Sequence, residues 1–124
     1  MGVSASALAK DVDLSKLPPP SDRHDVTYER DIKPILDNSC VKCHGGKKPK
    51  AKLNLETLPG ALAGGADGKV IERGNSAKSA LILDVAHLGD KGNWMPPPRN
   101  KAKIPPLTNE QIGLLRAWID QGAK

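Results

Sequence analysis

Two cysteines and a histidine stand at a spacing that serves one particular chemistry. Cys40 and Cys43 are separated by two residues, and His44 follows the second cysteine directly. This spacing is that of covalent attachment of a c-type haem. Each thiol adds to one vinyl group of the porphyrin, and the adjacent histidine supplies a nitrogen ligand to the iron. The motif therefore predicts one covalent haem c, bound through Cys40 and Cys43, with His44 as an axial ligand.

Three other uses of these residues are less well supported. A thioredoxin-like redox pair requires a strand-helix-strand context, and no such pattern surrounds Cys40. A structural zinc site requires four ligands, and the sequence has no second Cys-x-x-Cys and no His-x-x-x-His. A disulfide between Cys40 and Cys43 would close only a very small ring and would stabilise little.

The other side of the iron has few candidate ligands. Met95 is the only methionine apart from the first residue, and His24 and His87 are the remaining donors. Met95 lies between Trp94 and the prolines 96–98, which restrict the backbone and reduce the cost of ordering the thioether. A His/Met pair also raises the reduction potential, because a thioether favours ferrous iron. We predict Met95 as the second axial ligand, with the filling of a gap in the core as its alternative role.

The surroundings of the haem are less well specified by the sequence. His87 stands near a predicted helix end and is expected to meet solvent or a haem propionate, whereas His24 lies in an N-terminal arm. The backbone carbonyl of Pro49 is the candidate acceptor for the second ring nitrogen of His44. Arg73, Arg99 and the lysines after the motif are candidate partners of the propionates.

The composition fits a fold built around a cofactor. The chain has 124 residues, enough for one small domain. Its apolar fraction is 38%, it has no Phe, and its aromatic residues are Tyr28, Trp94 and Trp118. Because side chains that form a core are scarce, a large planar haem would supply apolar surface for them to pack against.

The charge is concentrated directly after the haem motif. The formal net charge is +5, and no acidic residue stands between Cys40 and Leu55. The lysines of this stretch are Lys42, Lys47, Lys48, Lys50 and Lys52. They predict either a positive patch that steers an acidic redox partner to the haem edge or a solvated loop. Nucleic acid is disfavoured as a partner, because no aromatic residues interleave with the lysines to stack bases.

The sequence also bears on the compartment. It has no run of about 18 apolar residues, so no membrane span is predicted. Residues 1–9 lack the basic and apolar regions of a signal peptide. Because c-type haem attachment takes place outside the bacterial cytoplasm, we expect a periplasmic protein, present here as a mature or excised domain.

Proline and hydrophobic periodicity divide the chain into an arm and one domain. Residues 1–25 are predicted to be an extended arm, since Leu17-Pro18-Pro19-Pro20 favours polyproline II and stops a helix. The arm either drapes over the domain, residues 26–124, or links it to another one.

About four short helices are predicted within the domain. Three of them span 27–38, 57–64 and 108–122, and the fourth begins at Ser79 or Asn75 and ends at Gly89. Pro34 predicts a kink or a later start in the first helix. Thr108 and Gln111 form a capping box at the start of the last helix. Residues 51–55 and 69–72 alternate in polarity and are candidates for a small antiparallel ribbon.

Several stretches, taken together, carry a resemblance to one family. They are Tyr28-Glu29-Arg30-Asp31-Ile32-Lys33-Pro34-Ile35-Leu36, Cys40-Val41-Lys42-Cys43-His44-Gly45, Leu53-Asn54-Leu55, Met95-Pro96-Pro97 and Trp118-Ile119-Asp120-Gln121-Gly122-Ala123. The chain resembles the planctomycete-type cytochrome c domain, a branch of the class I c-type cytochromes.

The resemblance implies an all-α class I cytochrome c fold around one covalent haem, with the first and last helices packed across each other near the haem edge. It implies Cys40 and Cys43 as thioether sites, and His44 and Met95 as axial ligands. It further implies a periplasmic electron carrier, or an electron-transfer module of a larger redox protein.

Two functions are compatible with such a haem. In the first, both axial positions are filled and the protein transfers electrons without acting as an enzyme. In the second, Met95 is absent from the iron or easily displaced, and the domain binds a small gas as a sensor. A four-helix cytochrome c′ is disfavoured, because its haem motif lies near the C-terminus.

Overall fold

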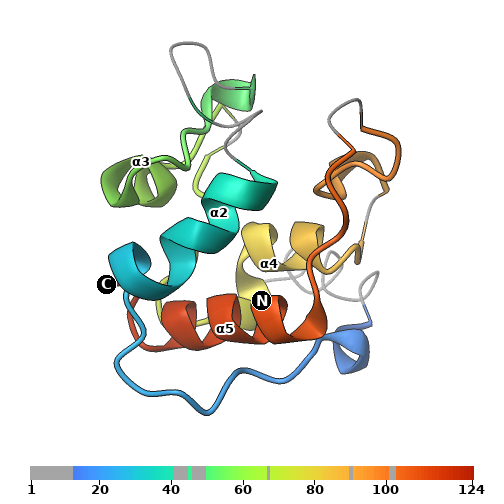
Figure 1. Ribbon diagram of the computed structural model, residues 1–124. Coiled ribbons are helices and arrows are strands. Elements are labelled where there is room, and N and C mark those ends of the chain that lie inside the picture. Colours follow the sequence, from blue (N-terminus) through green and yellow to red (C-terminus); the bar gives the residue numbers. More distant parts are fainter. Residues whose placement is uncertain (1–12, 41–44, 46–49, 67, 90, 101–102) are drawn as a thin grey trace, which may run out of the picture.

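The computed structural model describes residues 13–40, 45, 50–66, 68–89, 91–100 and 103–124 (Figure 1). Their α-helices are α2 (Lys33–Ser39), α3 (Leu58–Ala63), α4 (Ala80–Val85) and α5 (Asn109–Asp120). Single turns of other helix types cover Leu14–Lys16, Tyr28–Ile32, Lys50–Lys52, Ser76–Lys78 and Lys91–Asn93. The described chain is thus helical, in agreement with the predicted all-α class. None of its helices has the length and apolarity needed to cross a membrane.

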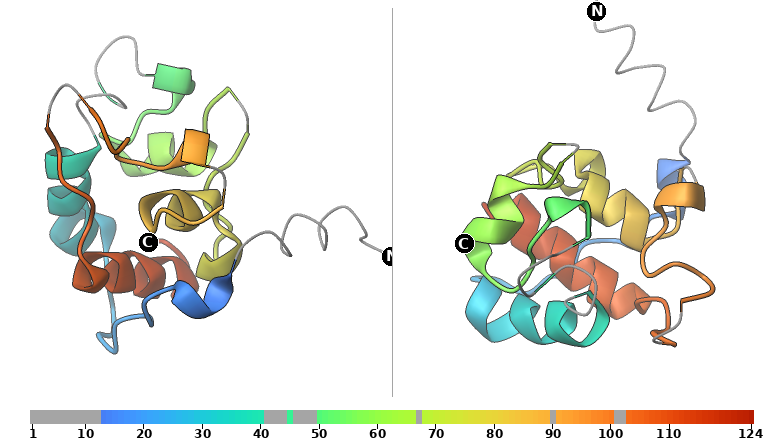
Figure 2. Two further views of the ribbon diagram at one scale, coloured as in Figure 1. Left: turned by 90° about the vertical axis from the view of Figure 1, so that its right-hand side faces the viewer. Right: turned by 90° about the horizontal axis from the view of Figure 1, so that it is seen from above.

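A core cluster of buried side chains joins these elements. Helix α5 contacts α4, the Ser76–Lys78 turn and the Tyr28–Ile32 turn. It lies below the other helices in the left view of Figure 2 and crosses between α2 and α4 in the right view. The core cluster consists of Leu17, Val26, Tyr28, Ile32, Ile35, Leu36, Cys40, Leu53, Leu55, Ala61, Ile71, Leu81, Ile82, Val85, Leu107, Ile112, Leu115, Ala117, Trp118, Ile119 and Ala123.

The first predicted helix is divided at Pro34. A π-turn, Tyr28–Ile32, comes first, and its last bond runs from the N–H of Lys33 to the carbonyl of Tyr28. Helix α2 then begins, with Pro34 in its first turn. A proline has no N–H, and its ring collides with the carbonyl four residues earlier. The wider π-turn before α2 accommodates this, so the helix starts later, which was one of the two predicted outcomes.

Tyr28 and Trp118 connect the beginning of this segment to α5. Both side chains are fully buried, and their ring centroids are 6.1 Å apart with the planes tilted by 44°. The main-chain oxygen of Lys124 accepts the Tyr28 N–H at 2.7 Å and the Trp118 indole N–H at 3.0 Å. The Tyr28 hydroxyl donates to the carbonyl of Leu55 at 2.8 Å. Burial raises the pKa of Tyr28 to about 12, so the hydroxyl stays protonated as a donor.

Local hydrogen bonds and backbone conformation determine where α4 and α5 begin or end. The Thr108 side chain accepts the N–H of Gln111 at 3.1 Å, and the Gln111 side chain accepts the N–H of Thr108 at 2.9 Å. The predicted capping box is therefore confirmed. Helix α4 is shorter than predicted, because His87 adopts a positive φ of 56°, which a right-handed helix does not accommodate.

The predicted ribbon of residues 51–55 and 69–72 is wrong: among the described residues the only bridge joins glycines elsewhere. The backbone groups of these stretches bond to other elements. The carbonyl of Leu55 accepts a tyrosine hydroxyl, and that of Val70 accepts the N–H of Leu81 at 2.9 Å. Leu53, Leu55 and Ile71 are buried in the core cluster, so the apolar residues of these stretches serve the core without pairing as strands.

The described part of the predicted arm drapes over α5. The N–H of Ser21 donates to the carbonyl of Gly113 at 2.9 Å, and Arg116 donates to the carbonyl of Pro18 at 2.6 Å. Gly113 permits this close approach, because a Cβ there would lie 2.7 Å from the carbonyl oxygen of Pro19.

Substitution of Gly113 tests this contact. Alanine favours a helix interior by about 1 kcal/mol over glycine, yet we expect Gly113→Ala to lower the free energy of unfolding by about 1 kcal/mol, because its methyl group overlaps the arm. Urea unfolding measures the stability, and hydrogen exchange of the Ser21 amide reports arm docking. Glu110→Ala, at an exposed position of the same helix, is the control. A more stable Gly113→Ala with an unchanged Ser21 amide would contradict the close approach.

Candidate haem site

The first cysteine of the haem motif lies at the end of α2. The N–H of Cys40 donates to the carbonyl of Leu36 at 2.8 Å. The residue is 8% exposed and belongs to the core cluster. Cys43 and His44 lie outside the described residues. The structure therefore places one attachment residue of the predicted haem, at the buried end of a helix.

Met95 packs against the same core cluster from a distant part of the sequence. It is half-buried and packs against the cluster that contains Cys40. Its N–H donates to the carbonyl of Asp84, in α4, at 2.9 Å. In Figure 1 the end of α2 and the segment that carries Met95 both lie above α4 and α5. Two residues predicted for one site thus contact one apolar cluster.

His87 holds a position that its sequence context did not indicate. Its Nε2 lies 3.0 Å from the carbonyl oxygen of Pro96, and because a carbonyl only accepts, Nε2 is the donor. The imidazole also stacks on Trp94, with ring centroids 5.0 Å apart and planes within 8°. We expected a contact with solvent or a propionate; the structure shows a bond to the Met95 loop. No local pattern signals this bond, since nine residues separate its partners.

Trp94 carries a buried donor beside Met95. Its indole Nε1 is inaccessible to solvent and has no acceptor within the described part of the chain. A buried polar group without a partner costs about 1–3 kcal/mol. A propionate of a bound haem is an acceptor of suitable chemistry. With the thiol of Cys40 and the thioether of Met95 on one apolar cluster, the described residues fit a covalent haem.

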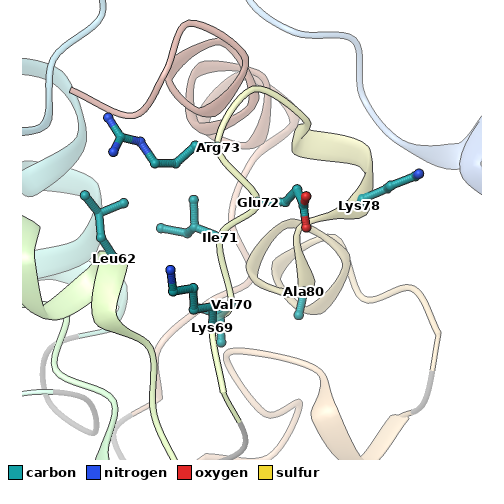
Figure 3. A pocket seen from close by; sticks show the side chains of 8 residues that line it. All are labelled: Leu62, Lys69, Val70, Ile71, Glu72, Arg73, Lys78 and Ala80. Atoms are coloured by element: carbon teal, nitrogen blue, oxygen red, sulfur yellow. The ribbon is translucent and has the colours of Figure 1, made fainter. Parts of the chain in front are cut away.

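The candidate propionate partner Arg73 contacts the chain after α5 through one of its nitrogens. Its Nε donates to the carbonyl of Gly122 at 2.8 Å, just beyond the end of α5. Figure 3 shows Arg73 at the edge of a pocket of about 380 Å³. The lining residues are Leu62, Lys69, Val70, Ile71, Glu72, Arg73, Lys78 and Ala80. Among the described residues, neither Cys40 nor Met95 lines this pocket. The other candidate, Arg99, is exposed.

Asp84 brings a carboxyl group close to this region. It is half-buried, and burial raises its pKa to about 6. Its backbone carbonyl accepts the N–H groups of both Met95 and His87, the latter at 3.2 Å. Asp84 therefore supports the Met95 segment through its backbone carbonyl. Partial burial of its side chain disfavours the ionised carboxylate.

The helical architecture of the described residues is compatible with a cytochrome c-type domain. A family model described as Planctomycete cytochrome C matches residues 40–99. The match begins at the first cysteine, ends beyond Met95 and confirms the predicted family for this segment, which is just under half of the chain. Comparisons with the curated proteins and with the solved structures found no match.

Substitution of Asp84 tests its electrostatic environment. An unfolded Asp titrates near pH 3.9, whereas the folded pKa is about 6, so wild-type stability is expected to fall as the pH rises from about 4 to about 6. Asp84→Asn lacks this loss, and because the side chain is half-exposed we expect a gain of about 1 kcal/mol at pH 7. Urea unfolding between pH 4 and 8 measures it. Parallel profiles for wild type, Asp84→Asn and the exposed control Asp22→Asn would refute the assignment.

Proposed function

We propose that this domain transfers single electrons through one covalent haem c, attached at Cys40 and Cys43 and ligated by His44 and Met95. The observation that carries the proposal is the packing of Cys40 and Met95 against one core cluster. The family match supports it, because the matched segment contains all four residues.

The chain's own residues would do two things for this reaction. When bound, the haem supplies a reversible one-electron couple of its iron. The core cluster excludes water, and the bond from the Met95 N–H to the carbonyl of Asp84 restrains the thioether segment. A restrained segment moves little between oxidation states. With His44 and Met95 as its two ligands, the iron would have no position left for a substrate, which favours a carrier over an enzyme.

The proposed partner is an acidic redox protein in the periplasm. Lys50 and Lys52 are exposed and precede the buried Leu53 of the core cluster. Lys42, Lys47 and Lys48 lie outside the described residues. A cationic surface next to the attachment segment would speed the encounter with a negatively charged partner. The domain would act as a free carrier or as one module of a larger redox protein.

Optical spectroscopy of the haem-loaded protein tests the ligation. We expect a low-spin, six-coordinate spectrum with a weak methionine-to-iron band that carbon monoxide does not alter rapidly. Met95→Ala should lose this band and bind carbon monoxide at once. Leu114→Ala is the control, because it removes a half-buried apolar side chain from the same cluster. Both variants should lose about 1–2 kcal/mol of stability, so only ligation separates them. A wild-type protein that is high-spin and binds carbon monoxide at once would favour the gas sensor.

Salt dependence tests the proposed partner surface. The Debye length is about 10 Å at 0.1 M salt, so electron transfer to an anionic acceptor protein should slow as ionic strength rises. The double variant Lys50→Gln/Lys52→Gln should be slower than wild type by about two- to tenfold at low salt, with the difference closing at high salt. Lys69→Gln/Lys78→Gln removes the same charge from the exposed lysines in Figure 3. Equal slowing of both double variants would show that net charge, and not this surface, steers the partner.

A further inference from the structure

One imidazole contacts both residues that flank Met95. The Nε2 of His87 donates to the carbonyl of Pro96 at 3.0 Å, and the ring stacks on Trp94 at 5.0 Å between centroids. Met95 itself is held through its N–H, which donates to the carbonyl of Asp84 at 2.9 Å. All three consecutive residues are therefore tied to the end of α4 and the turn that follows it.

The backbone of His87 is adapted to this task. Its φ is +56°, a left-handed conformation that a glycine adopts at lower cost. Its N–H donates to the carbonyl of Asp84, the same carbonyl that accepts the N–H of Met95. The turn after α4 thereby aims the imidazole at the Met95 segment. The hydrogen bond and the ring stack of the His87 side chain offset the cost of this left-handed backbone, which a glycine would not incur.

The two contacts restrain different motions. The hydrogen bond fixes the carbonyl after Met95, and the stacked ring limits rotation of the residue before it. Lys91 adds a cation 5.8 Å from the Trp94 ring. A segment restrained on both sides loses less conformational entropy when its thioether is bound than a free loop would.

We propose that His87 is the positioning residue for Met95, and that it keeps the thioether on the iron against competing ligands. This inference rests on the proposed His44/Met95 ligation. His87 acts through Trp94 and Pro96 and does not itself touch the iron. Its loss would favour displacement of Met95, by a lysine or hydroxide at high pH and by carbon monoxide in the ferrous protein.

The experiment uses the haem-loaded protein and three substitutions that separate the contacts. His87→Phe keeps an aromatic ring for stacking and removes the donor. His87→Gln keeps a donor and removes the stacking ring, and His87→Ala removes both. The matched control is His24→Ala, since His24 is exposed in the arm.

The main measurement is the pH at which the methionine-to-iron band disappears. A hydrogen bond and an aromatic stack together account for roughly tenfold in such an equilibrium. We therefore expect His87→Ala to lose the band about one pH unit below wild type and to bind carbon monoxide faster. His87→Phe and His87→Gln should fall between the two, and His24→Ala should match wild type.

A second measurement needs no substitution and remains valid if a variant fails to fold. Nitrogen NMR of the reduced wild-type protein should show His87 as the Nε2–H tautomer with a slowly exchanging proton. An Nδ1–H tautomer, or His87 variants whose band and carbon monoxide binding equal those of His24→Ala, would overturn the positioning role while leaving Met95 ligation intact. Absence of the methionine-to-iron band from the wild-type protein would reject the proposed function itself, and the positioning role with it.

Discussion

The arrangement of the whole domain depends on the joint between Tyr28 and Trp118. The two buried rings pack together, and both residues donate to the same main-chain oxygen of Lys124. A third bond from the Tyr28 hydroxyl reaches the extended chain at Leu55. Because these contacts fix the start of the π-turn and α2 against α5, they also determine where the far end of α2, with Cys40, can lie. In a chain with no Phe, few other side chains are large enough to serve this purpose.

A second support begins at α4, which also packs on α5. The helix stops at Val85, and the left-handed turn at His87 leaves the carbonyl of Asp84 to accept N–H groups from His87 and Met95. Cys40 and the Met95 segment thus follow two different helices, and the π-turn before α2 and α4 itself both contact α5.

The family match covers only part of the elements that build this arrangement. The match to planctomycete cytochrome c covers residues 40–99, which contain the attachment motif, α3, α4 and Met95. Tyr28, α2 and α5 lie outside it. The matched segment holds the residues with chemistry, whereas the joint that brings its two ends to one core cluster is made by the chain on either side.

The features that the sequence by itself determined are local ones. The haem motif spans five adjacent residues, and the capping box of α5 joins Thr108 to Gln111, so both can be recognised without knowledge of the fold. The helical class follows from short-range periodicity. Met95 was identifiable as a ligand candidate because the chain offers few alternatives, although its ligation stays a prediction.

The remaining features were decided by partners distant in the sequence. The alternation in residues 51–55 suggested strand pairing, but the carbonyl of Leu55 is bonded to Tyr28. For His87 the sequence suggested only solvent or a haem propionate, and the structure adds a left-handed turn that directs its ring to Trp94 and Pro96. A local pattern shows which side chains prefer burial or bonding. Only the packed structure determines which partner each one reaches, because that choice depends on how α2 and α4 are oriented on α5.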